Sequence, residues 1–324
     1  MNKVKCLLCP RECELRNGDR GNCRARMNID GKLQTLVYGK PCAVHVDPIE
    51  KKPLYHYLPG TGSFSIATAG CNLHCMFCQN WEISQSEPEN TTNIDLSPED
   101  VVTQAIATNC RTIACTYSEP IIFFEYAADI GRLAHKNGLL NVWVTAGYIN
   151  EAPLKEAVTF IDAAHVDLKG ITEDYYKSVC KGTLRPVLDT IKTMKQSGVW
   201  VEIINLVVPT YNDTSDDFSK LCDWVIENIG VEVPLHFSRF WPVYQLKNLP
   251  PTPEESLTLA RKIAMSKGMH YVYVGNVPGH EGNNTYCPVC KKLIIARQGY
   301  VISEYNIVGG KCRFCNHVIP GRWE

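Results

Sequence analysis

The chain has 324 residues, of which 45% are hydrophobic and 21% are charged, and its formal net charge is −1. These proportions are typical of a folded globular protein and argue against a disordered or low-complexity chain. The near-zero charge gives no overall attraction to nucleic acid or to an anionic membrane. The N-terminus has no secretory signal pattern, and no segment approaches the roughly 18 apolar residues of a membrane span, so we expect a cytoplasmic protein.

Sixteen cysteines are more than a packed core needs. Disulfides are rare in the cytoplasm, where clustered cysteines more often bind metal or carry out redox chemistry. Most of them fall into three clusters, and the others are interpreted as small buried packing residues. The scattered ones are Cys42, Cys110, Cys115, Cys180 and Cys222.

The first cluster lies in a segment, residues 1–31, that we expect to bind metal. Its members are Cys6, Cys9, Cys13 and Cys23. Their uneven spacing allows either zinc or an auxiliary iron-sulfur cluster. Pro10, Gly18 and Gly21 predict a loop rather than regular structure. We favour a structural role for this site over electron relay.

Residues 32–62 form a β-rich segment that leads into the second cluster, a CxxxCxxC loop. This loop contains Cys71, Cys75 and Cys78. Three thiolates can bind three irons of a four-iron cluster and leave one iron without a protein ligand, which is the open position that catalysis needs. The alternative is that a distant cysteine such as Cys42 or Cys115 completes the cluster, which would then only transfer electrons.

Beyond this loop, short β-rich runs alternate with amphipathic stretches, which indicates parallel strands joined by helical crossovers. The candidate strands are residues 63–69, 112–117, 141–146, 163–168, 199–208, 233–238 and 270–275. They are one fewer than the eight strands of a closed barrel. We therefore expect an α/β fold, a partial TIM-like (β/α)6-7 barrel over residues 63–282, with ligands at the carboxyl ends of its strands.

The third cluster consists of two CxxC pairs near the C-terminus. Its members are Cys287, Cys290, Cys312 and Cys315. Two such pairs can present four thiolates tetrahedrally, as in structural zinc ribbons. We expect residues 283–324 to form a small zinc-ribbon or rubredoxin-like lobe with structural zinc, iron being the alternative metal.

The run from Ser63 to Asn80, a strand followed by the CxxxCxxC loop with Phe77 before its last cysteine, resembles the signature of radical S-adenosylmethionine (SAM) enzymes. More narrowly, the chain resembles the AmmeMemoRadiSam system radical SAM enzymes, which are relatives of the pyruvate formate-lyase activating enzyme. The narrower resemblance covers essentially the whole chain. It rests on the Asp47–His56 run DPIEKKPLYH, the CQNW run that starts at Cys78, the N-terminal CLLCP run and the C-terminal CxxC pairs.

The resemblance implies a 4Fe-4S cluster on Cys71, Cys75 and Cys78 whose open iron binds SAM. It implies that an electron from a flavodoxin- or ferredoxin-type donor cleaves SAM to methionine and a 5′-deoxyadenosyl radical, which abstracts hydrogen from a substrate. One possible substrate is the backbone glycine of a partner enzyme, as for glycyl radical enzyme activating enzymes. Others are a small molecule or another protein of the AmmeMemoRadiSam system. A non-catalytic iron-sulfur or zinc protein that relays electrons or binds nucleic acid is a further alternative.

The resemblance also assigns roles to polar residues at strand ends. Related activating enzymes use a Gly-Gly-Glu motif to receive the amino group of SAM, and only Glu119 of that motif is present here, which argues against an identical loop geometry. Because Pro120 follows it, Glu119 also suits the N-terminus of a helix. Asp167 and Lys169 alternate along one strand and so share a face. By resemblance, Lys169 contacts the carboxylate of SAM and Asp167 helps to hold the site; an exposed pair at a strand end is the alternative.

Three further residues are candidates for the SAM site. His236, in a Pro-x-His sequence like that of the related enzymes, is implied to lie near the nucleoside, although a core histidine is the alternative. Thr145 and Asn205, near the ends of two strands, are open equally to a packing interpretation. The Lys51–Lys52 and Lys291–Lys292 pairs are too short for a nucleic-acid patch and are interpreted as exposed surface.

Overall fold

The computed structural model describes residues 3–324. Its centre is an eight-stranded sheet in the order β12-β11-β10-β9-β8-β7-β6-β5. Strands β6 to β12 pair in parallel in chain order, and β5 adds to β6 in antiparallel orientation. The strands are β5 (Ala43–Pro48), β6 (Gly62–Ala67), β7 (Thr112–Cys115), β8 (Leu140–Thr145), β9 (Ala163–Asp167), β10 (Trp200–Val207), β11 (Leu235–Arg239) and β12 (Val272–Gly275). Because β5 and β12 are the two edges of this sheet, the barrel is open on one side.

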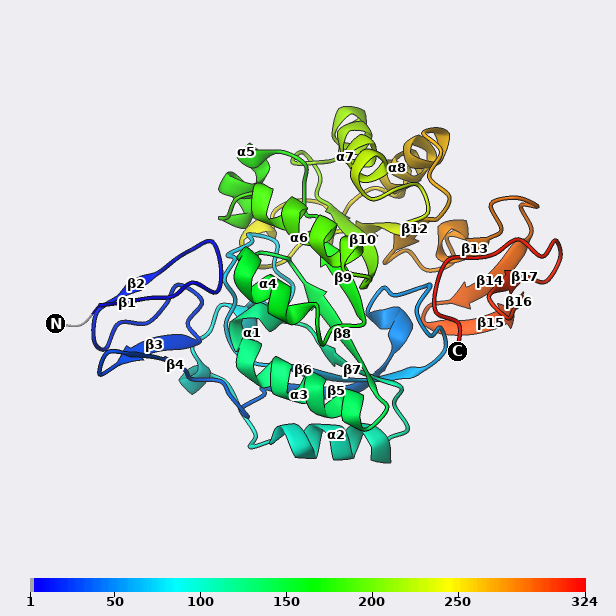
Figure 1. Cartoon of the computed structure of the whole chain (residues 1–324). Helices are drawn as coiled ribbons and strands as arrows, with labels where there is room; N and C mark the ends of the chain where they lie inside the picture. Colours follow the sequence, from blue (N-terminus) through cyan, green and yellow to red (C-terminus); the bar gives the residue numbers. More distant parts are fainter. Residues whose placement is uncertain (1–2) are drawn as a thin grey trace.

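Helices on the outer face connect the parallel strands (Figure 1). They are α2 (Pro98–Ala107), α3 (Phe124–Lys136), α4 (Glu151–Ala157), α6 (Arg185–Gln196), α7 (Ser215–Asn228) and α8 (Glu254–Ser266). Ser97 and Asp100 form a reciprocal capping box that starts α2, and Pro98 occupies its first turn. On α6, Val187, Ile191 and Met194 are buried against the sheet, with Leu188 packed beside them. The expected α/β partial barrel is thus confirmed.

All seven parallel strands lie where the sequence predicts them, within two residues at each end. The sequence did not single out β5, although it lies in the segment expected to be β-rich. This strand is half exposed, ends in Pro48 and pairs on one side only. An edge strand of this kind lacks the continuous apolar run that marks the central strands.

Two small cysteine-rich lobes flank the barrel, at opposite sides in Figure 1. The N-terminal lobe has two antiparallel pairs, β1 (Val4–Lys5) with β2 (Glu14–Leu15) and β3 (Arg26–Ile29) with β4 (Lys32–Thr35). The C-terminal lobe contains β13 (Thr285–Tyr286), β14 (Leu293–Gln298), β15 (Val301–Tyr305), β16 (Ile307–Val308) and β17 (Lys311–Cys312). Its apolar residues share a core with Tyr55, Tyr271 and Tyr273 of the barrel.

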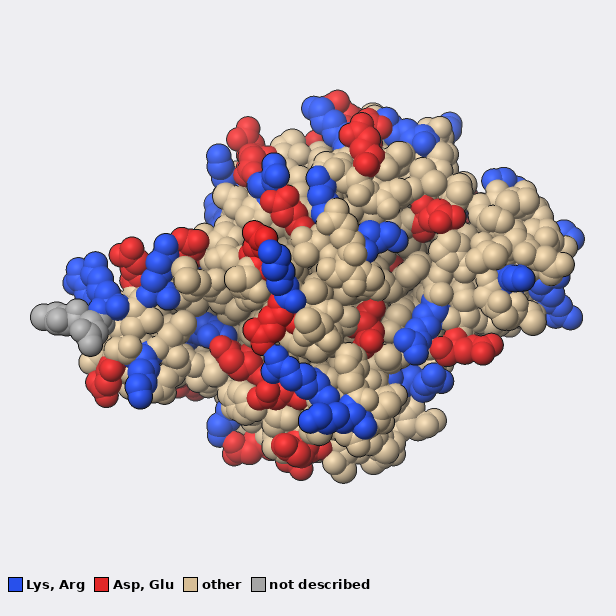
Figure 2. Space-filling view, viewed as in Figure 1, with Lys and Arg blue, Asp and Glu red and all other residues tan. Residues whose placement is uncertain are grey.

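Acidic and basic side chains alternate over the face shown in Figure 2, without a broad patch of one sign. A few of them form ion pairs one helical turn apart, such as Lys155 with Glu151 and Lys220 with Asp216. Such exposed pairs contribute little to stability individually. Within the described residues, no helix is long and apolar enough to cross a bilayer.

Candidate active site

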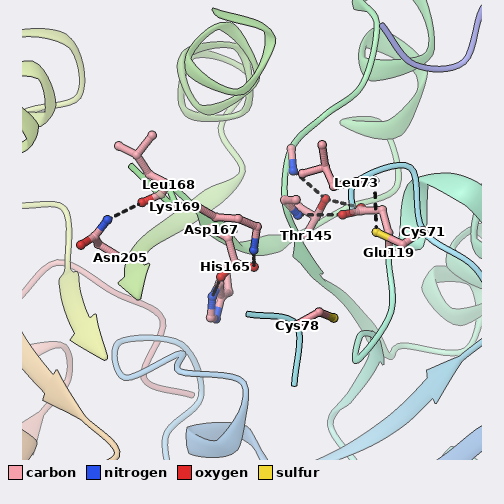
Figure 3. Close-up of polar contacts among 12 residues, drawn as sticks. Cys71, Leu73, Cys78, Glu119, Thr145, His165, Asp167, Leu168, Lys169 and Asn205 are labelled. Carbon is pink, nitrogen blue, oxygen red and sulfur yellow. Dashed lines mark hydrogen bonds and ion pairs between the residues drawn. The ribbon is translucent and has the colours of Figure 1, made fainter. Parts of the chain in front are cut away.

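A cavity of about 520 Å³ lies at the carboxyl ends of the parallel strands. Its lining brings together predicted residues from segments far apart in the sequence: Cys71, Cys75, Cys78, Glu119, Asp167, Lys169 and His236. Ligands bind at this end of the strands in barrels of this kind. Thr145 and Asn205 are not among the lining residues, although both lie close behind them (Figure 3).

The CxxxCxxC loop follows β6 and is held by backbone hydrogen bonds to the short helical segment at Tyr176–Cys180. The amide of His74 donates to the carbonyl of Cys180 over 3.1 Å, and the amide of Met76 donates to the carbonyl of Val179 over 3.0 Å. Two of the sulfurs have polar neighbours of their own. The Leu73 amide donates to Cys71 Sγ at 3.4 Å, and the Ser84 hydroxyl lies 3.2 Å from Cys78 Sγ. Hydrogen bonds to sulfur are one means by which proteins tune iron-sulfur clusters.

Cys71, Cys75 and Cys78 can hold an iron-sulfur cluster, in which each thiolate binds a different iron. Among residues 3–324, the one set of three or more ligating side chains whose donor atoms all lie within 4.8 Å of one another is at the C-terminus. Cys71, Cys75 and Cys78 face one cavity without meeting at that spacing. A cluster whose thiolates bind different irons requires this wider arrangement.

Cys180 is not the isolated packing residue that we expected. It is fully buried, and its interaction with Cys75 lowers the pKa of Cys75 against the opposing effect of burial. The alternative fourth ligands, Cys42 and Cys115, do not line the cavity. No spacing rule connects Cys180 to the CxxxCxxC loop, so the sequence alone could not reveal this contact.

Lys169 and Asp167 form an ion pair in the cavity wall, with Lys169 Nζ 2.8 Å from Asp167 Oδ2 (Figure 3). The other carboxylate oxygen of Asp167 lies 3.0 Å from His165 Nε2, and the second ring nitrogen of His165 lies 2.8 Å from the carbonyl of Lys52. The Lys52 carbonyl and the Asp167 carboxylate can only accept, so His165 is the donor toward each of them. Burial opposes both charges, but their attraction outweighs it, keeping the pKa of Asp167 low and that of Lys169 high.

Glu119 uses both carboxylate oxygens to tie the end of β7 to the end of β8. Oε1 accepts from the Thr145 hydroxyl at 2.5 Å and from the Ile121 amide at 3.3 Å, while Oε2 accepts from the Ala146 amide at 2.8 Å. It also caps the 3-10 helix η3 (Pro120–Phe123), as its position before Pro120 suggested. Burial raises the pKa of Glu119 to about 7 in spite of these donors.

The loop before Glu119 retains a glycine-like backbone although it contains no glycine. Tyr117 has a φ of 61°, in the left-handed region that a bulky residue rarely adopts. The Tyr117 hydroxyl donates to Asp47, and Lys52 Nζ lies 4.4 Å from the centre of its ring. These contacts hold the strained residue in place. Ser118 lines the same cavity, and its hydroxyl is buried without a partner among the described residues.

The interpretation of Lys51 and Lys52 as a solvent-exposed pair is wrong for Lys52. Its side chain is 1% exposed and its ammonium lies 2.5 Å from Asp47, which also pairs with Lys51 at 2.8 Å. Burial lowers the pKa of Lys52 to about 8. Both lysines line the cavity. A two-residue basic run is typical of an exposed surface. The sequence does not show that the carboxylate of Asp47, five positions earlier, folds back to pair with Lys52.

His236 lines the cavity with its ring held from behind. Its Nε2 lies 2.7 Å from Oε2 of the fully buried Glu202, and Tyr55 packs edge-on against the ring. Asn205 Nδ2 donates to the carbonyl of Leu168 at 2.8 Å, which fixes the backbone between Asp167 and Lys169. Thr145 likewise holds Glu119, through the hydrogen bond from its hydroxyl to Oε1. These two side chains therefore support the cavity wall.

The C-terminal cysteines form a closed tetrahedral set. Cys287 Sγ lies 3.6 Å from Cys315 Sγ, and Cys290 Sγ lies 3.7 Å from Cys312 Sγ. With zinc-sulfur bonds of about 2.3 Å, a tetrahedron places its sulfurs about 3.8 Å apart. The Lys292 amide lowers the pKa of Cys290 to about 7, which favours the thiolate that a metal requires. The four side chains can therefore hold a structural zinc ion.

Comparisons with known proteins agree with this geometry. The family model described as the radical SAM superfamily matches residues 65–225. The chain is 47% identical to an uncharacterised protein of Methanocaldococcus jannaschii over 98% of this chain and 95% of that one. It is 25% identical to the pyruvate formate-lyase-activating enzyme of Clostridium pasteurianum over 49% of this chain and 67% of the enzyme.

Solved structures show the same fold. A radical SAM methyltransferase from Sphaerobacter thermophilus superposes with a TM-score of 0.54 at 14% identity, over 73% of this chain and 71% of that one. TYW1 with a lysine-pyruvate adduct bound superposes with a TM-score of 0.51 at 16% identity, over 72% of this chain and 87% of that one. The cysteine loop, the open barrel and the family match agree: the chain belongs to the radical SAM superfamily.

Proposed function

We propose that this chain is an enzyme that holds a 4Fe-4S cluster on Cys71, Cys75 and Cys78 and cleaves SAM reductively to abstract hydrogen from a substrate. The observation that supports it most directly is the single cavity that contains these three thiols, the Lys169–Asp167 pair and the unpartnered Ser118 hydroxyl. When bound and reduced by one electron, such a cluster supplies the electron that splits the sulfonium of SAM into methionine and a 5′-deoxyadenosyl radical.

The residues around the cluster site suit the methionine end of SAM. Lys169 carries a fixed positive charge that can pair with the carboxylate of SAM, and Asp167 and His165 hold it in place. Ser118 lines the cavity beside this pair, and its buried hydroxyl has no partner among the described residues, so a small rotation could offer it to the amino or carboxylate group. The left-handed Tyr117 turns the backbone of this loop toward the cavity. His236, held by Glu202, is positioned for the nucleoside end.

This arrangement argues against a protein that only relays electrons or binds nucleic acid. A relay cluster needs neither a cavity of about 520 Å³ nor a charged pair beside its open side. The charges of the displayed face are also mixed in sign (Figure 2). A flavodoxin- or ferredoxin-type protein is the class of donor that would deliver the electron.

The reaction can be tested after anaerobic reconstitution with iron and sulfide. With dithionite and SAM, the protein should form 5′-deoxyadenosine and methionine, measured by mass spectrometry. Cys75→Ala should abolish both products, whereas Cys222→Ala, which removes a buried thiol on α7, should retain them. Absence of 5′-deoxyadenosine from protein with a spectroscopically intact cluster would refute the proposal.

Within the superfamily, we propose the AmmeMemoRadiSam system group. The relative from Methanocaldococcus jannaschii supports a grouping by whole-chain architecture, since it matches both cysteine-rich lobes as well as the barrel. The Asp47–His56 run that carries the resemblance contributes Lys51, Lys52 and Tyr55 to the cavity lining. We therefore expect this run to help select the substrate, be it a small molecule or a protein of that system.

Activation of a glycyl radical enzyme is the second candidate. It is favoured by the similarity to the pyruvate formate-lyase 1-activating enzyme of Escherichia coli, 22% identical over 61% of this chain and 87% of the enzyme. The test is to incubate the reconstituted protein, SAM and reductant with a glycyl radical enzyme from the same genome. A glycine-centred doublet in the EPR spectrum would support this candidate, and its absence despite 5′-deoxyadenosine formation would favour the first.

A further inference from the structure

The four N-terminal cysteines surround one small hollow. Its lining includes Cys6, Cys9, Cys13 and Cys23, together with Arg11, Arg26, Asn72, Ile121 and Ile122. Three of the four thiols are buried, Cys13 being the partly exposed one. Turns close the loops around them: the Cys6 amide donates to the carbonyl of Cys13 over 3.0 Å, and the Glu12 amide donates to that of Cys9 over 3.1 Å. Four thiols on one hollow make a metal site far more plausible than four independent packing residues.

The spacing of these thiols separates them from the C-terminal set. The C-terminal sulfurs meet at the spacing of a zinc tetrahedron, and the N-terminal ones, which also lie within the described residues, do not close to within 4.8 Å as a group. In this respect they resemble Cys71, Cys75 and Cys78. A wider set of four thiolates around one hollow suits a 4Fe-4S cluster, in which each thiolate binds a different iron.

Two buried polar atoms at this hollow have no protein partner. Arg26 is 4% exposed and its Nε has no hydrogen bond, although its terminal nitrogen pairs with Glu125. Asn72 is fully buried and its Oδ1 has none either. A buried polar atom without a partner is costly, and Nε of Arg26 is a donor that a sulfur of a bound cluster can satisfy, whereas Oδ1 of Asn72 can only accept. The guanidinium of Arg26 can balance the negative charge of a four-thiolate cluster, and the Asn22 amide, 3.5 Å from Cys13 Sγ, can donate to a sulfur.

This hollow lies directly beside the CxxxCxxC loop, which contains Cys71, Cys75 and Cys78. Asn72 follows Cys71 in the chain and lines the hollow together with Cys9. Gly70 precedes Cys71 with a φ of 98°, and a Cβ at this position would lie 2.3 Å from the carbonyl oxygen of Cys23. Any other residue would push the two loops apart. Arg11 closes the contact by donating to the carbonyl of Asn72 at 3.0 Å.

We propose that Cys6, Cys9, Cys13 and Cys23 bind a second 4Fe-4S cluster, and that this cluster passes electrons to the cluster on Cys71, Cys75 and Cys78. The relay rests on the proposed function, whereas the second cluster does not. In the relay, a reduced flavodoxin- or ferredoxin-class donor gives one electron to the N-terminal cluster. That cluster is oxidised again when it gives the electron to its neighbour, and no bond forms or breaks in the transfer. This proposal differs from the structural role that spacing alone favoured for these cysteines.

The cluster is tested by metal content, which does not depend on SAM chemistry. After anaerobic reconstitution, the triple variant Cys71→Ala/Cys75→Ala/Cys78→Ala should retain about four irons and four sulfides per chain, since one cubane remains. It should also give an EPR signal after reduction with dithionite. A triple variant without iron, or one with zinc at the N-terminal site in addition to the C-terminal zinc, would overturn the proposal.

The relay is tested by comparing two reductants within one variant. Cys9→Ser/Cys13→Ser should slow reduction of the remaining cluster by flavodoxin at least tenfold relative to its reduction by dithionite, followed by EPR after rapid freezing. The ratio of the two rates cancels any partial loss of folded protein. Cys42→Ser, which removes a thiol outside both sites, should keep the wild-type ratio. An unchanged ratio in the double variant would exclude the relay while leaving the proposed SAM cleavage intact.

Discussion

The buried thiol of Cys180 interacts with that of Cys75, and this interaction is the largest cause of the lowered pKa of Cys75. Cys180 ends the π-helical segment whose carbonyls hold His74 and Met76, so the same few residues position the loop and place a fourth sulfur beside it. In the proposed cluster, three cysteine ligands would leave one iron open for SAM, whereas four would close the cluster and restrict it to electron transfer. Cys180 is therefore the residue on which that distinction can be tested.

We predict that Cys180→Ala retains the iron of this site, because three thiolates leave the open position that SAM requires. Iron per chain, measured by atomic emission after anaerobic reconstitution, should match the wild type. Cys75→Ala is the matched control and should lose about four irons. If Cys180→Ala loses the same amount, the cluster has four protein ligands and the proposed function fails.

The charge of Lys169 should contribute directly to SAM affinity. Charged hydrogen bonds are worth about 1.5–3 kcal/mol, so Lys169→Met should raise the Kd for SAM roughly tenfold to a hundredfold. The variant also leaves Asp167 without its partner, and the unpaired carboxylate repels that of SAM. Calorimetric titration of the reconstituted protein measures the change. Lys262→Met, on the exposed face of α8, should bind SAM like the wild type, and equal affinity in both variants would contradict this role.

The C-terminal metal should be zinc and should hold its lobe together. Metal analysis should find zinc in the wild type and none at this site in Cys312→Ser, which replaces a fully buried ligand. Structural zinc supplies binding free energy on the order of 10 kcal/mol to small domains, so the lobe should unfold and become sensitive to trypsin. Cys222→Ser, a buried thiol outside the lobe, should keep its zinc. Iron in place of zinc would identify the site as rubredoxin-like instead.

Loss of this zinc should also disturb the lining of the cavity. Tyr300, at the turn between β14 and β15, lines the cavity with Tyr55, and Arg297 of β14 lies 4.0 Å from the centre of the Tyr55 ring. Arg297 also donates to the carbonyl of Tyr55 at 2.9 Å. The lobe is thus part of the cavity mouth as well as a metal-bound appendage.

The sequence predicted the main features of the site because they follow from local rules. The CxxxCxxC spacing marks one loop, and Glu119, Asp167 and Lys169 stand at the ends of parallel strands, whose carboxyl ends meet at one edge of a sheet. Strand alternation alone was therefore enough to place these residues near one another.

The residues that were missed depend on contacts between distant segments. Cys180 looks like any buried cysteine until the fold brings it to Cys75, and Lys52 looks like surface until Asp47 and Tyr117 enclose it. Ser118 lies in an ordinary polar loop, and only the fold shows that it lines the cavity next to the left-handed Tyr117. Pattern rules describe neighbours along the chain, so they carry no information about such encounters.

His56 anchors the C-terminal tail to the barrel. Its Nδ1 lies 2.7 Å from the carbonyl of Pro320, so it donates there, and its Nε2 accepts from the Tyr273 hydroxyl at 2.6 Å. Burial lowers the pKa of His56 to about 4. Protonation of the ring would set two donors against each other at Nε2, and no water can solvate the charge.

The sign of the pH effect follows from this pKa. Between about pH 6.5, where an unfolded histidine titrates, and about pH 4, the unfolded chain binds a proton that the folded chain does not. The free energy of unfolding should therefore fall as the pH falls through this window, by about 3 kcal/mol in total from His56, and this contribution should level off below it. Urea unfolding at pH 7, 6, 5 and 4.5 measures the slope of the unfolding free energy against pH.

Two variants serve as the test and the control. His56→Asn retains a donor for Pro320 and should be less stable at pH 7 but with a shallower slope. His270→Asn, at an exposed position, should keep the wild-type slope. Parallel slopes in the wild type and His56→Asn would show that His56 is not the group responsible.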